Sequence, residues 1–161
     1  LRVTRAACVP LIINDRVDVA VTVGAEGVHL GQEDLPISLA RQMLASDRLI
    51  GKSTHTLEQA IAADLDGADY IAVGPVFPTP TKPEYPSVGL ALISEVRARV
   101  SKPLMVIGGV EEATLADILI AGAECIAVVR AVCDAVDPEA AARTLKGTVV
   151  QFIRTSRQAS L

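Results

Sequence analysis

Short, nearly unbroken apolar runs alternate along the chain with longer stretches in which apolar residues recur every three or four positions. The short runs predict six strands, at residues 10–14, 27–30, 49–53, 70–74, 104–108 and 125–129. A strand covered on both faces needs apolar side chains on both, so continuous runs are typical of parallel sheets flanked by helices. The longer stretches predict helices at residues 15–23, 36–44, 56–66, 90–100 and 114–121, and one starting at Pro138.

Two helix starts carry capping signals. Thr56 followed by Gln59 is a capping-box arrangement, and Asp137 precedes Pro138, a residue suited to the first helical turn. Gly-Ala-acid triplets at residues 24–26, 67–69 and 122–124 each stand directly before a predicted strand, at unequal spacing. Such a repeat predicts strand–helix units with loops of variable length. A (β/α) barrel and a complete six-stranded open sheet both satisfy it.

Composition narrows the function classes. Half of the 161 residues are hydrophobic but aromatics are scarce, so the core should be aliphatic and stacking platforms for nucleic acid are lacking. A net charge of −4 gives no general attraction for nucleic acid or for an anionic membrane. No apolar stretch reaches the roughly 20 residues that span a bilayer. Three widely spaced cysteines without metal-ligand spacing suit a reducing, cytoplasmic location.

Candidate chemistry follows the strands, because active residues of parallel barrels stand after the carboxyl ends of strands. Asn14 and Asp15 follow the first predicted strand and Asp34 follows the second. Two carboxylates on neighbouring strands suit Mg²⁺, which takes one or two carboxylates together with phosphate oxygens. Either carboxylate could instead cap the helix that follows. Ser53, after the third strand, is either a hydrogen-bond donor to a phosphate or a turn residue. His29 lies inside a strand and is predicted to have a structural role.

The loop after the fourth predicted strand contains five prolines between residues 75 and 88. Proline lowers the entropic cost of ordering a long loop. Thr79, Thr81 and Lys82 add two hydroxyl donors and a cation, which predicts a lid for a phosphate-rich ligand. After the fifth strand, Gly109 lets backbone approach a ligand closely, and Val129 and Arg130 follow the sixth. In phosphate-binding barrels the last two such loops form the phosphate site.

Five segments together resemble the thiamin-phosphate synthase family: 10–16 (PLIINDR), 27–34 (GVHLGQED), 51–53 (GKS), 74–82 (GPVFPTPTK) and 107–109 (IGG). The resemblance implies a TIM (β/α)8 barrel, of which residues 1–146 would form the last six units and residues 147–161 a helix end and tail. It also implies a transferase that condenses a pyrimidine diphosphate with a thiazole phosphate and releases diphosphate.

The resemblance further implies the roles of individual residues. Asp15 and Asp34 would hold Mg²⁺; Asn14, Ser53 and Lys82 would contact the pyrimidine diphosphate, with Ser53 and Lys82 catalytic. The thiazole phosphate would lie against the residues of the later loops, namely Thr79, Thr81, Gly109, Val129 and Arg130.

This chain also departs from the family. It lacks the Gln-x-Arg-x-Lys-like segment of the first two strands, so we expect the 161 residues alone to be inactive. Arg130 replaces a common Ser and either strengthens the phosphate site or points to solvent; Lys52 replaces an apolar residue and either adds charge near the diphosphate or points outward. A thiazole tautomerase-like relative and a non-catalytic phosphate-binding barrel are the alternatives. Whether the protein forms a homo-oligomer is not determined by the sequence.

Overall fold

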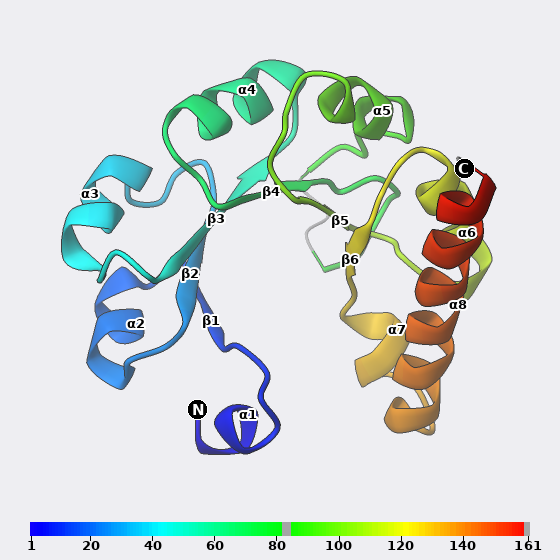
Figure 1. The fold of residues 1–161 in the computed structure, drawn as a ribbon, viewed down its shortest axis with the longest axis horizontal. Helices are drawn as coiled ribbons and strands as arrows, with labels where there is room; N and C mark the ends of the chain where they lie inside the picture. Colours follow the sequence, from blue (N-terminus) through cyan, green and yellow to red (C-terminus); the bar gives the residue numbers. More distant parts are fainter. Residues whose placement is uncertain (82–84, 160–161) are drawn as a thin grey trace. The chain divides into compact units, whose positions relative to one another are not determined.

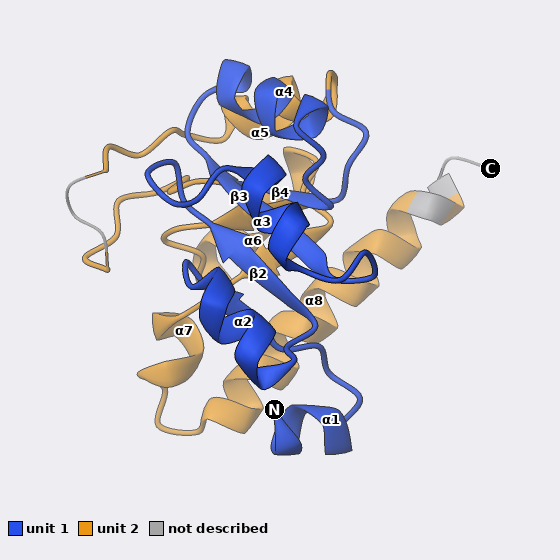
Figure 2. Ribbon diagram, turned by 90° about the vertical axis from the view of Figure 1, so that its left-hand side faces the viewer, with its two compact units in different colours: residues 1–72, 100–103 blue, residues 73–99, 104–161 orange. Residues whose placement is uncertain are grey.

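The computed structural model describes residues 1–81 and 85–159 of the chain. It divides into two compact units, coloured separately in Figure 2. Unit 1 comprises residues 1–72 and 100–103, and unit 2 comprises residues 73–99 and 104–161.

Unit 1 alternates helices and parallel strands in chain order (Figure 1). Its elements are α1 (Arg2–Ala6), β1 (Ile12–Asn14), α2 (Val17–Val23), β2 (Gly27–Leu30), α3 (Ile37–Met43), β3 (Leu49–Thr54), α4 (Leu57–Leu65) and β4 (Tyr70–Val73), the last residue of which belongs to unit 2. β1 pairs with β2 and β2 with β3, both parallel, so Asn14 lies opposite His29 and His29 opposite Gly51. This register brings the carboxyl ends of β1, β2 and β3 to one edge.

Unit 2 repeats the alternation. Its elements are α5 (Ala91–Arg97), β5 (Leu104–Ile107), α6 (Glu112–Ile120), β6 (Cys125–Ala127), α7 (Arg130–Cys133) and α8 (Pro138–Ala159). β5 and β6 are parallel, with Ile107 opposite Ala127. α8 packs on α6 and α7. Among residues 1–81 and 85–159, no helix has the length and apolar character needed to cross a bilayer.

The cores of both units are aliphatic, as the composition predicts. In β2 the side chains of Val28 and Leu30 are fully buried, while His29 between them is only half-buried. Successive strand residues point to opposite faces, so Val28 and Leu30 share the apolar face and His29 occupies the other. The strand thereby presents a polar side chain without interrupting its hydrophobic packing.

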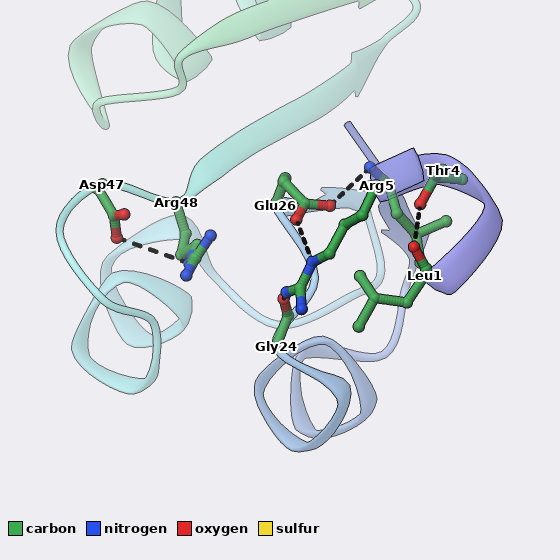
Figure 3. A network of polar contacts seen from close by, with 8 residues as sticks. Leu1, Thr4, Arg5, Gly24, Glu26, Asp47 and Arg48 are labelled. Carbon is green, nitrogen blue, oxygen red and sulfur yellow. Dashed lines mark hydrogen bonds and ion pairs between the residues drawn. The ribbon is translucent and has the colours of Figure 1, made fainter. Parts of the chain in front are cut away.

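The acid of the repeated Gly-Ala-acid triplet has a structural role in unit 1. The Leu11 amide donates to a Glu26 carboxylate oxygen at 2.9 Å, and the Ile50 amide donates to Asp69 at 2.7 Å. Arg5 reaches the same Glu26 at 3.3 Å and also donates to the Gly24 carbonyl, as Figure 3 shows. In both cases the acid accepts from a backbone amide near the start of a neighbouring strand, which accounts for its position before β2 and before β4.

All six predicted strands and the six predicted helices are confirmed, with ends shifted by a few residues. Two details differ. α6 begins at Glu112 rather than at Thr114, because the Thr114 hydroxyl accepts from the Glu111 amide at 3.0 Å and closes the first turn. The short helix α7 was not predicted, since four residues are too few to show a helical period. The chain is an α/β protein of parallel strands in sequential order.

Candidate active site

Two carboxylates follow the carboxyl ends of β1 and β2 in unit 1. The Asp15 amide donates to the His29 carbonyl at 2.8 Å, which continues the β1–β2 pairing one residue past the strand. Asp15 has φ 63°, a left-handed conformation that costs energy for any residue except glycine. Asp34 folds back over its own turn, and its Oδ2 accepts from the Gly31 amide at 2.6 Å.

Neither carboxylate acts as a helix cap. The N-cap of α2 is Arg16 and that of α3 is Pro36, and neither has a side-chain capping bond. The capping interpretation of Asp15 and Asp34 is therefore wrong. The left-handed backbone at Asp15 and the turn closed by Asp34 are therefore local features of the loops after β1 and β2.

The donor set fits Mg²⁺. Two carboxylates on adjacent strand ends match the ion's usual protein ligands, the remainder being water and substrate oxygens. One Asp34 oxygen accepts from the Gly31 amide, which orients the carboxylate, and among residues 1–81 and 85–159 no hydrogen bond to its second oxygen is seen. Within the described residues, no group of three or more His, Cys, Asp or Glu side chains could enclose a metal by themselves.

Lys52 supports the same turn. Its ammonium donates to the Gly31 carbonyl at 2.7 Å. Burial lowers the pKa of Lys52, while the negative charges of Asp34, Asp66 and Glu33 act in the opposite direction. Of the two orientations left open by the sequence, the ammonium lies at the loop after β2, close to the Asp34 charge, rather than out in solvent.

Ser53 is held from two directions. Its carbonyl accepts from the Gln32 side-chain amide at 2.5 Å, and its hydroxyl lies 2.8 Å from His29 Nε2. Ser53 lies within β3 rather than in the turn into α4, and the cap of that helix is Thr56, as predicted, which accepts from the Gln59 amide at 3.2 Å. The simple turn interpretation of Ser53 is therefore wrong, and its hydroxyl belongs to a side-chain network.

That network includes Tyr70, which the sequence interpretation missed. The other ring nitrogen of His29, Nδ1, lies 2.9 Å from the Tyr70 hydroxyl, and the two rings stack with centroids 5.5 Å apart. Burial raises the pKa of Tyr70 to about 12. His29 is satisfied, as predicted for a structural histidine, but its partner Ser53 is a candidate site residue. The available signal was Gly51, a glycine inside an apolar strand that leaves room for a large neighbour.

In unit 2 the loop after β4 packs on the loop after β5. The amides of Val76 and Phe77 donate to the carbonyls of Ile107 and Gly108 at 3.0 and 3.1 Å. Gly109 has φ 65°, and a Cβ there would lie 2.6 Å from Phe77 Cβ. Only glycine therefore fits against the neighbouring loop, while the predicted approach of this backbone to a ligand stays a prediction.

The remaining predicted residues of unit 2 lie on these loops and on α7. The Thr79 hydroxyl accepts from the Thr81 amide at 3.3 Å, so the first threonine is fixed by its own turn. Lys82 lies outside the described residues. Val129 is the N-cap of α7 and Arg130 its first residue; the exposed Arg130 guanidinium pairs with Asp134 at 3.1 Å. Of its two predicted orientations, the structure shows the solvent-facing one.

Parallel strands in sequential order, with polar side chains after their carboxyl ends, define an α/β protein of the (β/α) class. Residues 1–132 match the family model described as thiamine monophosphate synthase, and the chain belongs to this family.

Individual proteins that are similar to the chain in sequence or structure carry the same family name. The chain is 51% identical to the thiamine-phosphate synthase of Chloroflexus aurantiacus over 91% of its own length and 68% of that protein. It is 50% identical to that of Mycobacterium sp. (strain KMS), covering 87% of this chain and 62% of that one. It superposes on a thiamine phosphate pyrophosphorylase from Pyrococcus furiosus with a TM-score of 0.87 at 36% identity, covering 94% and 72%. The chain thus spans about two thirds of the length of the proteins it matches.

Proposed function

We propose that the protein containing this chain is a transferase of thiamin biosynthesis. It would join 4-amino-2-methyl-5-hydroxymethylpyrimidine diphosphate to 4-methyl-5-(2-phosphoethyl)thiazole, giving thiamin phosphate and diphosphate. The observation that carries the proposal is the position of Asp15 and Asp34 just after two neighbouring strands, with Ser53 on the next strand. The names of the relatives support the same reaction.

In this reaction the bond between the pyrimidine methylene carbon and the diphosphate oxygen breaks, and its electron pair leaves with the diphosphate. The thiazole nitrogen forms the new bond to that carbon, so no enzyme nucleophile is needed. Asn14 and Ser53 of unit 1 would donate to the diphosphate, and Asp15 and Asp34 would hold Mg²⁺. The ion would neutralise charge on the leaving group, the electrostatic contribution that such chemistry most requires.

Residues of unit 2 would bind the thiazole phosphate. Thr79 and Thr81 offer hydroxyls, Gly109 offers backbone at a position where no side chain fits, and the amides at Val129 and Arg130 begin α7. Because the Arg130 guanidinium pairs with Asp134, its backbone rather than its charge would serve the phosphate. Lys82 would contact the diphosphate and act in catalysis, a role that rests on the resemblance of its sequence segment to the family.

We further propose that the complete catalytic fold is an eight-unit TIM barrel, to which this chain contributes six units. Six strands in sequential order and relatives about half as long again support this view. The two further units would supply the basic residues that grip the diphosphate. The 161 residues alone should therefore show no turnover.

The test is a diphosphate-release assay with both substrates and Mg²⁺, on the protein in the form in which the cell produces it. Asp34→Asn keeps the side-chain shape but removes the charge, and Lys82→Ala removes the ammonium; each should lower kcat/KM about 100-fold or more. Asp47→Asn is the matched control, since Asp47 is exposed and pairs only with neighbouring Arg48 in the described part of the chain (Figure 3).

Full turnover by Asp34→Asn would contradict the assigned metal site. Absence of diphosphate release by the wild-type protein, together with conversion of a thiazole phosphate between tautomers, would instead indicate a tautomerase. Saturable phosphate-ligand binding without either reaction would indicate a non-catalytic relative.

A further inference from the structure

The side chains of Tyr70, His29 and Ser53 form a continuous hydrogen-bonded row across three strands of unit 1. The Tyr70 hydroxyl lies 2.9 Å from His29 Nδ1, and His29 Nε2 lies 2.8 Å from the Ser53 hydroxyl. β2 pairs directly with β3, so His29 and Ser53 are held on adjacent strands. The proposed function explains Ser53 but leaves Tyr70 and His29 without a role.

A neutral imidazole carries one N–H and one bare nitrogen, so it donates to one of its hydroxyl partners and accepts from the other. If Tyr70 donates to Nδ1, then Nε2 carries the proton and donates to Ser53, and the hydroxyl proton of Ser53 is left to donate to a ligand. In the reverse arrangement Nδ1 carries the proton and donates to Tyr70, while the Ser53 hydroxyl donates to Nε2. Ser53 can then only accept a hydrogen bond from a ligand. The direction of the row therefore decides whether Ser53 can bind an anion.

Two observations favour donation by Tyr70. A phenol is a stronger donor than an aliphatic alcohol, and its ordinary pKa of about 10 still leaves it protonated at physiological pH. His29 Nδ1 is also the one hydrogen-bond partner of the Tyr70 hydroxyl among the described residues. If Tyr70 did not donate to it, the half-buried hydroxyl proton would lack an acceptor, which costs free energy.

The strand sequence is shaped to permit this contact. Gly51 lies opposite His29 in the register, and any Cβ at that position would overlap the Tyr70 ring. The missing side chain lets the ring lie across β3 and stack on His29 with an interplanar angle of 26°. On the other side, Gln32 holds the Ser53 carbonyl, so both ends of the row are fixed.

We propose that Tyr70 and His29 are positioning residues that make Ser53 an obligatory hydrogen-bond donor to the leaving diphosphate. The proposal rests on the proposed function for the identity of the ligand, but the direction of the row can be measured without any turnover. Polarisation along a chain of hydrogen bonds should also strengthen the donor at its end.

The first experiment is long-range ¹H–¹⁵N NMR on the protein in the form in which the cell produces it, labelled at histidine. The His29 signal is identified by its loss in His29→Gln. We expect the Nε2–H tautomer in the wild-type protein and a shift toward Nδ1–H in Tyr70→Phe, which keeps the ring but lacks the donor. An Nδ1–H tautomer in the wild-type protein would overturn the proposal. This measurement requires no substituted protein, so its outcome does not depend on whether a variant folds.

The second experiment measures the affinity for inorganic diphosphate with Mg²⁺. Tyr70→Phe should weaken it about fivefold, the change expected for one neutral hydrogen bond, while Asp47→Asn should leave it unchanged. His29→Gln places an amide N–H₂ near the position of Nε2 and should retain most of the affinity; the shorter His29→Asn should lose it. Equal losses in both histidine variants, or none in Tyr70→Phe, would contradict the proposal. Failure of the wild-type protein to bind diphosphate would instead count against the proposed function, with the tautomer result unaffected.

Discussion

Gly51→Ala should disrupt unit 1 through a single steric contact. An added Cβ would lie 2.5 Å from Tyr70 Cε1 and closer still to Cζ and Oη. Because non-bonded carbons pack at about 3.5 Å or more, the ring must retreat by at least about 1 Å. The 2.9 Å bond to His29 Nδ1 would not survive that movement. Overpacking costs about 1–3 kcal/mol and the lost bond about 1 kcal/mol, so the free energy of unfolding should fall by roughly 2–4 kcal/mol.

The assay is urea denaturation followed by circular dichroism. Gly147→Ala is the matched control, because Gly147 lies inside α8 and a Cβ there meets nothing within 4 Å. That change should stabilise the protein by about 0.5–1 kcal/mol. In a Tyr70→Ala background, Gly51→Ala should become neutral or stabilising, since the obstructing ring is absent. A stable Gly51→Ala protein, or the same loss in both backgrounds, would refute the steric argument.

Two further predictions concern unit 1. Thr56→Ala should lower the free energy of unfolding by about 1 kcal/mol, because it removes the hydroxyl that caps α4 by accepting from the Gln59 amide, whereas Thr56→Ser should be nearly neutral; equal losses in the two urea titrations would exclude capping as the cause. The raised pKa of Tyr70 predicts that its stabilising contribution is complete below pH 10, the ordinary phenol pKa, and is lost as pH rises through about 12, because the unfolded chain ionises first. Ultraviolet titration should show a phenolate step near pH 12 that Tyr70→Phe lacks, and a wild-type step near pH 10 with no later one would contradict this.

Much of the candidate site could be located from the sequence, because parallel strands place whatever follows them at one edge. Asp15, Asp34 and Ser53 were found this way. Their alternative roles could not be excluded from sequence, since an aspartate before a helix looks the same whether or not it caps. In the structure the N-caps of α2 and α3 are Arg16 and Pro36, and this excludes the capping role of the two aspartates.

The sequence by itself determined the order and type of the elements in this protein. Continuous aliphatic runs specified buried parallel strands, and the Gly-Ala-acid triplets marked where β2, β4 and β6 begin, because both signals act between residues close in the chain. Which side chains contact each other across neighbouring strands was decided only by the tertiary structure. Tyr70 is 41 residues from His29, and their contact requires both the strand register and the space left at Gly51. A local pattern carries no record of such a contact, since it forms only when the strands have paired.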